Sequence, residues 1–383
     1  MDNKDKELDV DKAVQDDAPL TDKAEAAPCK EGSSNKKNIL WTVLSIAIAG
    51  LTVYAITSQS QDFSISDFAG FVSNINPVWI IASILGMAGF IIFEGMAIVT
   101  LCKGFGYKKG FGNGYIYSAS DIYVSAITPS ATGGQPASAY FMMRDGIPGS
   151  VVTVALLINV VLYLFSILIL GVACFIAMPS KIFAFSTLSK TLIIVGAVVL
   201  SLLSMLFILL LQKHTLLHSI CRKFIQLLAK LRLIKHRESK FKKLEAWIDS
   251  YRDCALALKG KKWVIVKALG FNLLQRISYL LITVFAFLAV GGAASHAGEM
   301  FVMQEMVVIG SNCIPIPGAM GIADYLMIDA FSSIVDGSMA VNLELLARTI
   351  SFYLCVIICG FSFFFKLLKS NKKHKNQEKT NVR

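Results

Sequence analysis

Two proline- and glycine-rich segments interrupt the long apolar runs of this chain, and they are its first candidates for chemistry. Residues 128–136 read TPSATGGQP, and residues 315–324 read PIPGAMGIAD. Proline removes a helical N–H and glycine weakens a helix, so neither segment continues a regular helix. The N–H groups that open a half-helix beyond such a break favour an anion, such as a lipid phosphate. The candidate binding residues here are Thr128, Pro129, Gly133, Gly134, Gln135, Arg144, Pro315, Pro317, Gly318 and Asp324. The alternative is a plain loop in each case.

Charged side chains inside the apolar runs are the second clue. Glu94 lies deep in one run, and Arg276 lies about 20 Å along its predicted helix from Trp263, at 1.5 Å per residue. A charge at the centre of a bilayer costs about 2.5–3.5 kcal/mol on insertion scales, so such residues face a partner or a cavity. We predict that Glu94 and Arg276 form a pair, with Gln275 and Glu305 along the same path. The alternative is an ion pair that only fixes helix packing.

The motifs of several enzyme classes are missing from the sequence. It contains no GxxxxGK[ST], no HExxH and no CxxC. These are the patterns that bind a nucleotide phosphate or a zinc ion. We therefore predict no catalytic residue, no metal ligand and no cofactor, and leave open whether the chain acts as an enzyme.

The apolar runs that must position these residues indicate a polytopic all-α membrane protein. The chain is 55% hydrophobic and 16% charged, below the roughly 25% charged residues of a soluble domain. A helix of about 20 apolar residues spans a bilayer core of about 30 Å. Six runs qualify, at Ile39–Thr57, Val78–Leu101, Val151–Met178, Leu192–Leu211, Val264–Val290 and Ala347–Leu368.

The distribution of basic residues predicts the topology. Residues 212–262 carry fourteen Lys or Arg against four acids, and the tail 369–383 is also basic. The positive-inside rule places both in the cytoplasm. That requires Tyr115–Met143 and Phe301–Ala330, the two segments with the breaks, to be re-entrant hairpins that enter from opposite faces. One hairpin in each half is typical of the inverted repeats of transporters.

Three regions follow from this pattern. Residues 1–37 are predicted to be a disordered, acidic cytoplasmic tail, 38–368 the membrane domain, and 369–383 a basic cytoplasmic tail. The loop 212–262 is predicted either to form a helix on the inner leaflet or to remain a solvated loop. The net charge of +11 does not indicate a nucleic-acid binder, because the basic residues lie beside apolar spans.

The two broken segments resemble the lysylphosphatidylglycerol synthase transmembrane family, also called the flippase-like membrane family. TPSATGGQPASAYFMMRDGIP at Thr128–Pro148 and PIPGAMGIAD at Pro315–Asp324 carry the resemblance, which covers about Ile39 to Leu368. The second motif departs from the usual pattern at two positions. Ala319 stands where a second glycine is common, and Asp324 stands where a glutamate is common.

The resemblance implies a flippase of the bacterial plasma membrane that moves an aminoacylated or anionic phospholipid such as lysyl-phosphatidylglycerol. It also implies resistance to cationic antimicrobial peptides. In full-length relatives a cytosolic domain transfers lysine from lysyl-tRNA to phosphatidylglycerol. Only about fifteen residues follow Leu368 here, fewer than the roughly 50 that a domain needs. The expected partner is therefore a membrane phospholipid, with no nucleic acid bound directly. A lysyltransferase activity, a separate synthase partner, a homo-oligomer and a scaffold that recruits proteins through its basic loop are the alternatives.

Overall fold

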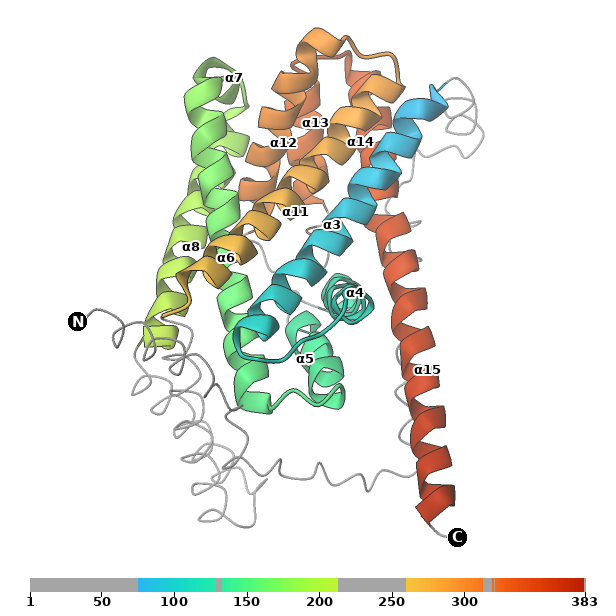
Figure 1. Cartoon of the computed structure of the whole chain (residues 1–383). Helices are drawn as coiled ribbons and strands as arrows, with labels where there is room; N and C mark the ends of the chain where they lie inside the picture. Colours follow the sequence, from blue (N-terminus) through green and yellow to red (C-terminus); the bar gives the residue numbers. More distant parts are fainter. Residues whose placement is uncertain (1–74, 129–132, 213–259, 313–318, 320, 382–383) are drawn as a thin grey trace, which may run out of the picture.

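The structure, a computed structural model, describes residues 75–128, 133–212, 260–312, 319 and 321–381. These residues are helical or form short connections, with no strand among them. The longer helices are α3 (Pro77–Gly104), α4 (Phe111–Ile127), α5 (Gly134–Arg144), α6 (Gly149–Ala177), α8 (Thr187–Gln212), α11 (Lys262–Ala289), α12 (Ala297–Ser311), α13 (Ile322–Phe331), α14 (Gly337–Arg348) and α15 (Cys355–Asn381). A short helix α7 (Pro179–Phe183) joins α6 to α8 (Figure 1). The all-α prediction is confirmed.

Five of the six predicted spans fall in the described part of the chain. Each corresponds to a helical stretch long and apolar enough to cross a membrane, the last of them being Met339–Lys369. The predicted span Ile39–Thr57 lies outside the described residues, as do the tail 1–37 and residues 213–259 of the basic loop.

Helices α3 and α11 run side by side diagonally across the bundle and pack against each other along most of their length (Figure 1). Trp79 stacks on Phe285 near one end, and Phe93 stacks on Phe271 further along. Between them the Ser83 hydroxyl donates to the carbonyl oxygen of Ile282 at 3.2 Å. This pairing places the polar side chains of α3 and those of α11 at the same level along the two helices.

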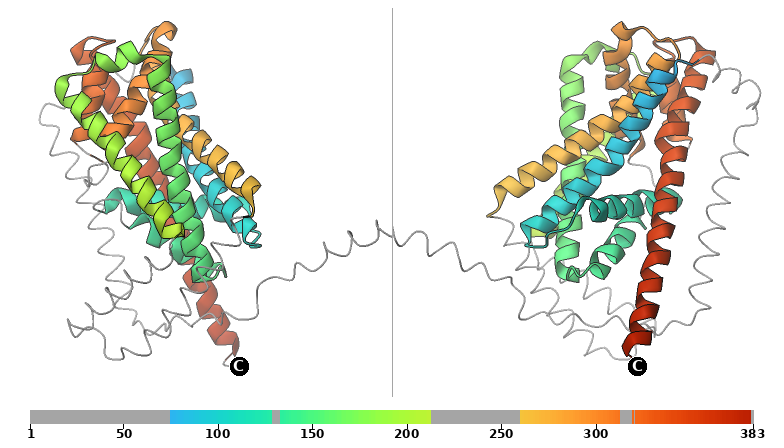
Figure 2. Two further views of the ribbon diagram at one scale, coloured as in Figure 1. Left: turned by 90° about the vertical axis from the view of Figure 1, so that its left-hand side faces the viewer. Right: turned by 45° about the vertical axis from the view of Figure 1, so that its right-hand side comes forward.

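The first hairpin is the pair α4 and α5. These helices pack on each other, and α4 lies across the direction of α3 and α15 (Figures 1 and 2). Two glycines bring α4 onto α3: a Cβ on Gly95 would lie 2.5 Å from the carbonyl of Gly114, and one on Gly114 would lie 2.7 Å from the Gly95 oxygen. Small residues of this kind allow helix backbones to approach closely in membranes. The contact places the following turn of α4 beside Glu94.

The second hairpin is the pair α12 and α13, which lie side by side (Figure 1). Two of the described residues in its break have left-handed backbone, Ala319 with φ 50° and Gly321 with φ 81°. Glycine adopts this conformation without a Cβ clash, whereas alanine does so at a cost of about 1–2 kcal/mol. The family that the chain resembles commonly has glycine at position 319, and glycine would adopt this backbone without that cost.

The last span is not one regular α-helix. Helix α14 leads into a π-helical stretch, Thr349–Leu354, and α15 then continues to Asn381, beyond the predicted boundary at residue 368. Helix α15 holds the first hairpin through aromatic contacts, in which Tyr123 and Phe141 pack on Phe363 at ring-centroid distances of 5.5 and 5.6 Å. The hairpin is thus packed between α3 and α15.

Both predicted breaks separate two helices, and neither α4, α5, α12 nor α13 is long and apolar enough to count as a span. Entry of the hairpins from opposite faces of a membrane stays a prediction. The proposed binding residues Pro129, Pro315, Pro317 and Gly318 lie outside the described residues.

Candidate functional site

Glu94 is buried where α3, α4 and α11 meet. Its Oε2 accepts hydrogen bonds from the Ser118 hydroxyl at 3.0 Å and from Gln275 Nε2 at 3.2 Å. Asp121 lies one turn beyond Ser118 on α4, close enough to repel Glu94 electrostatically. No lysine or arginine forms an ion pair with either carboxylate within the part of the chain that the structure describes. We refer to Glu94, Ser118, Asp121, Gln135 and Gln275 as the Glu94 site.

Asp121 lies against the first turn of α5. Gln135 Nε2 donates to its Oδ2 at 2.6 Å, and the Ser125 hydroxyl donates to its Oδ1 at 3.1 Å. A Cβ on Gly134 would collide with this carboxylate and with the Ser125 hydroxyl, so only glycine fits there. The sequence predicts that the start of this half-helix is open to an external anion. In the structure a carboxylate of the chain itself already lies beside that positive end, where the helix dipole favours it.

Arg276 is 3% exposed and lies between two aromatic rings. Its guanidinium carbon is 4.8 Å from the ring centroid of Tyr163 and 5.4 Å from that of Tyr279. Two of its nitrogens, Nε and Nη2, have no hydrogen-bond partner among the described residues. Glu305 on α12 is fully buried, lies within electrostatic reach of Arg276, and also has no hydrogen-bond partner for either carboxylate oxygen. We refer to these four residues as the Arg276 site.

The predicted ion pair between Glu94 and Arg276 is wrong. Glu94 is held by Ser118 and Gln275, and no bridge of 4.0 Å or less joins it to Arg276. The reason lies in the helix: neighbouring residues are rotated by about 100° around the axis at 3.6 residues per turn. Gln275 therefore contacts α3, while Arg276 turns toward α6 and α12.

Helix α11 carries polar side chains that contact α3 on one side and α6 on another. Asn272, one turn before Arg276, donates to Asn159 Oδ1 on α6 at 3.1 Å. The side-chain oxygens of Asn272, Gln275 and Gln304 are buried without a hydrogen-bond partner in the described chain. An unpaired buried polar atom costs about 1–3 kcal/mol. This concentration of unsatisfied atoms around α11 is typical of a place that binds water or a polar ligand.

Asp324 has an arginine partner. Its Oδ2 accepts from the Gly321 backbone N–H at 2.8 Å, and its Oδ1 forms an ion pair with Arg348. Arg348 also lies 3.6 Å from Glu344, one turn earlier on α14. We refer to Asp324, Glu344 and Arg348 as the Arg348 site.

The remaining predicted residues lie apart from these sites. Thr128 bridges the first break: its hydroxyl donates to the Val124 carbonyl at 2.7 Å and accepts from the Gly133 N–H at 3.1 Å. Arg144 lies at the opposite end of α5 from Gly134, about 15 Å along the helix, where it donates to the Tyr140 hydroxyl at 2.6 Å. Thr128 and Gly133 thus shape the hairpin, while Arg144 is distant from the Glu94 site.

Several residues of these sites were not among the predicted binding residues: Ser118, Asp121, Tyr163, Tyr279, Glu344 and Arg348. For Arg348 a signal existed, because a charge that opens an apolar run is unusual and Glu344 lies four residues before it. No comparable signal exists for the tyrosines, since aromatic residues are common in every span. Among the described residues no three His, Cys, Asp or Glu side chains gather as metal ligands.

Comparison with known proteins identifies the family. The family model described as the lysylphosphatidylglycerol synthase TM region matches residues 42–359 of the chain. Among curated proteins no sequence matches. The family match ties this membrane protein to lysyl-phosphatidylglycerol metabolism.

Proposed function

The chain belongs to the lysylphosphatidylglycerol synthase transmembrane-region family, and from this premise we propose that it moves an aminoacylated phospholipid such as lysyl-phosphatidylglycerol between membrane leaflets. One observation carries the proposal. Glu94, which forms no ion pair with a lysine or arginine among the described residues, receives a hydrogen bond from Gln275, and the next residue of α11 is the buried Arg276, whose Nε and Nη2 have no hydrogen-bond partner there. Negative and positive sites side by side suit a headgroup that bears both ammonium groups and a phosphate.

The Glu94 site would hold the ammonium group. A buried carboxylate is costly unless a cation or a proton balances it. Ser118, Gln135 and Gln275 supply hydrogen bonds but no charge. The lysyl ammonium of the substrate would provide the missing positive charge, and a proton would take its place when the site is empty.

The Arg276 site would hold the phosphate. A guanidinium presents several donors in a plane and binds phosphate by charge-assisted hydrogen bonds. The rings of Tyr163 and Tyr279 keep the Arg276 side chain in place by cation–π contacts without occupying Nε and Nη2. Glu305, on the other side, would repel the phosphate and so favour its release.

The proposal includes a topology. Both termini would lie in the cytoplasm of a bacterial cell, and the two hairpins would enter the plasma membrane from opposite faces. Moving a lipid with a net positive headgroup to the outer leaflet lessens the attraction of that surface for cationic peptides. Resistance to such peptides would follow from this activity.

A leaflet-resolved assay in proteoliposomes tests the proposal. We expect the Glu94→Gln, Asp121→Asn double variant to slow the flipping of fluorescent lysyl-phosphatidylglycerol at least about tenfold, the equivalent of about 1.4 kcal/mol. The same variant should flip unmodified phosphatidylglycerol as the natural protein does, whereas Arg276→Gln should slow both lipids. Glu299→Gln is the matched control, because Glu299 pairs with Lys181 on the surface. Flipping of both lipids at the natural rate by all variants would remove this site.

A lysyltransferase activity is the second candidate, because the family is described as the transmembrane region of lysylphosphatidylglycerol synthase. It requires lysyl-lipid formation from lysyl-tRNA and phosphatidylglycerol by the purified chain, alone or with a separate synthase. Product formation by the chain alone, with the flipping assay negative, would favour this candidate.

A further inference from the structure

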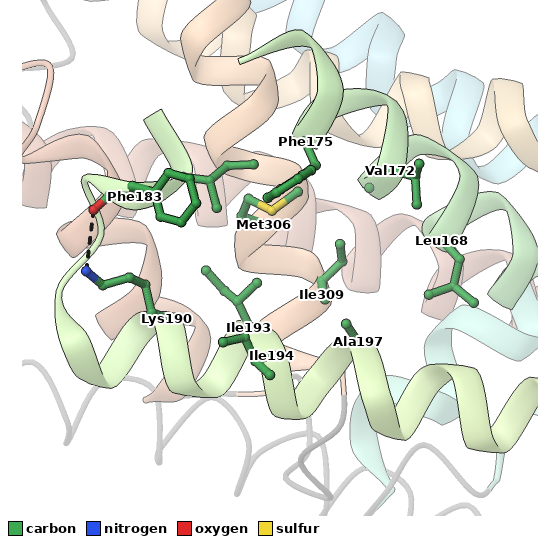
Figure 3. A pocket seen from close by; sticks show the side chains of 12 residues that line it. Leu168, Val172, Phe175, Phe183, Lys190, Ile193, Ile194, Ala197, Met306 and Ile309 are labelled. Atoms are coloured by element: carbon green, nitrogen blue, oxygen red, sulfur yellow. Dashed lines mark hydrogen bonds between the residues drawn. The ribbon is translucent and has the colours of Figure 1, made fainter. Parts of the chain in front are cut away.

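A cavity of about 330 Å³ lies between α6 and α8, and its lining includes no residue of the Glu94 or Arg276 sites (Figure 3). Helix α12 forms its floor, and α7 lies at one end. Its lining consists of eleven apolar residues and one cation, Lys190. The volume falls in the range of about 300–1,000 Å³ that is usual for ligand pockets.

The cavity opens sideways, toward the position of the lipid. Val172 is 60% exposed and Ile194 is 64% exposed, so the rim is open, while Ile193, Met306 and Ile309 are buried beneath it. Both rim helices are candidate membrane spans. The lining extends from Leu168 to Phe175 along α6, about 10 Å at 1.5 Å per residue. This cavity, which we call the slot, is elongated and apolar and lies on the lipid-facing side of two spans. Its shape and lining fit an acyl chain.

Charge distinguishes the two ends of the slot. Figure 3 shows Lys190 and Phe183 at one end and Leu168 at the other. The Lys190 ammonium contacts the Phe183 carbonyl at 3.4 Å, and no carboxylate among the described residues forms an ion pair with it. Lys190 lies one turn from the start of α8, where the Ser186 N–H already donates to Asp329 Oδ2 at 3.0 Å, so Lys190 itself supplies the positive charge at that end. An anion is therefore favoured beside Lys190.

We propose that this cavity binds an anionic phospholipid, with one acyl chain in the slot and the phosphate beside Lys190. This lipid is distinct from the transported one, because the slot contains none of the residues of the Glu94 or Arg276 sites. It would still contact the transport machinery, since Met306 in the floor directly follows Glu305 on α12. The site goes beyond the proposed function and does not depend on it.

Photocrosslinking in vesicles tests the proposal. The probe is phosphatidylglycerol with a diazirine at the end of one acyl chain, and labelled peptides are identified by mass spectrometry. We expect the label on the α6 and α8 segments that line the slot. Ala197→Phe fills the slot and should lower this labelling at least about fivefold. Val198→Phe is the matched control, because Val198 is exposed and does not line the cavity. Equal labelling of the natural protein and Ala197→Phe would overturn the proposal.

Two further variants test the proposal independently of Ala197→Phe. Val172→Phe enlarges an exposed rim residue, leaves the interior unchanged and should also lower the labelling. Lys190→Gln should abolish the preference for phosphatidylglycerol over phosphatidylcholine carrying the same diazirine, and Lys190→Arg should retain it. A preference that survives Lys190→Gln would overturn the assignment of the phosphate to Lys190. Flipping is not measured, so these results stand apart from those for the Glu94 and Arg276 sites.

Discussion

Each hairpin has an aspartate beside the first turn of its second helix, but the two charges are balanced differently. Asp121 lies against the first turn of α5, and Asp324 lies within the first turn of α13. Asp324 is paired with Arg348 from α14, whereas the partners of Asp121 among the described residues are the neutral side chains of Gln135 and Ser125. The second hairpin is thus neutralised by the protein, and the first leaves its negative charge to a ligand or a proton.

Helix α11 repeats this contrast on two successive residues. Gln275 offers a neutral amide to Glu94 in the first half, and Arg276 offers a cation to Glu305 in the second. If the difference is functional, removing a cation should destabilise the part of the protein around the second hairpin. Neutralising an acid should leave the part around the first hairpin folded. The predictions below test this contrast.

The largest effect is expected for Arg348→Met. The change leaves the buried Glu344 carboxylate and the partly exposed Asp324 carboxylate together without a cation, and breaking a fully buried pair costs about 3–5 kcal/mol. Because the Asp324 side chain keeps 34% exposure, we expect the low end, a loss of about 3 kcal/mol in the free energy of unfolding. Chemical denaturation in detergent measures it. Adding Asp324→Asn and Glu344→Gln to the same chain should restore most of the loss, and no recovery would contradict the pairing.

A smaller effect is expected for Gly134→Ala in the first hairpin. The new methyl group would collide with the Asp121 carboxylate and the Ser125 hydroxyl, and overpacking of this kind costs about 1–3 kcal/mol. Gly112→Ala on α4 is the matched control, since a Cβ there meets nothing within 4 Å. The two thermal unfolding temperatures should differ, with only Gly134→Ala lower than the natural protein. Equal temperatures would mean that α5 does not begin against Asp121.

Asp121→Asn should change the stability by no more than about 1 kcal/mol, because the amide keeps an acceptor for Gln135 and leaves no cation unpaired. The same substitution at Asp324 leaves Arg348 with only Glu344 and should cost more. Parallel unfolding of the two variants measures the difference. A larger loss for Asp121→Asn than for Asp324→Asn would refute the contrast between the hairpins.

The smallest effect concerns Glu299, at the start of α12 and outside the candidate spans. The hydrogen bond from Lys181, at 2.8 Å, lowers the pKa of Glu299 below its usual 4.5, with a smaller contribution from His296. A lowered folded-state pKa contributes stability above the unfolded-state value and loses it as the pH falls through the folded-state value. Exposed pairs are worth at most about 1 kcal/mol. Below about pH 4.5, Glu299→Gln should therefore lose less stability than the natural protein, as measured by unfolding across pH 3–6.

The described spans and the two breaks could be predicted from the sequence because both are local properties. A run of about 20 apolar residues satisfies its own backbone hydrogen bonds in lipid whatever lies beside it, and proline or glycine interrupts it at a known residue. Glu94, Gln275, Arg276 and Glu305 were predicted as polar residues of the interior for the same reason, and all four are buried.

Which of these residues touch each other was decided only by the tertiary structure. Gln275 and Arg276 are neighbours in the chain, yet a rotation of about 100° sends one to Glu94 and the other toward Glu305. The crossing at Gly95 and Gly114 sets which turn of α4 meets Glu94, and the approach of α14 supplies Arg348 to Asp324. Helix rotation and crossing depend on the packing of all neighbours at once, so hydropathy and spacing along one chain do not contain them.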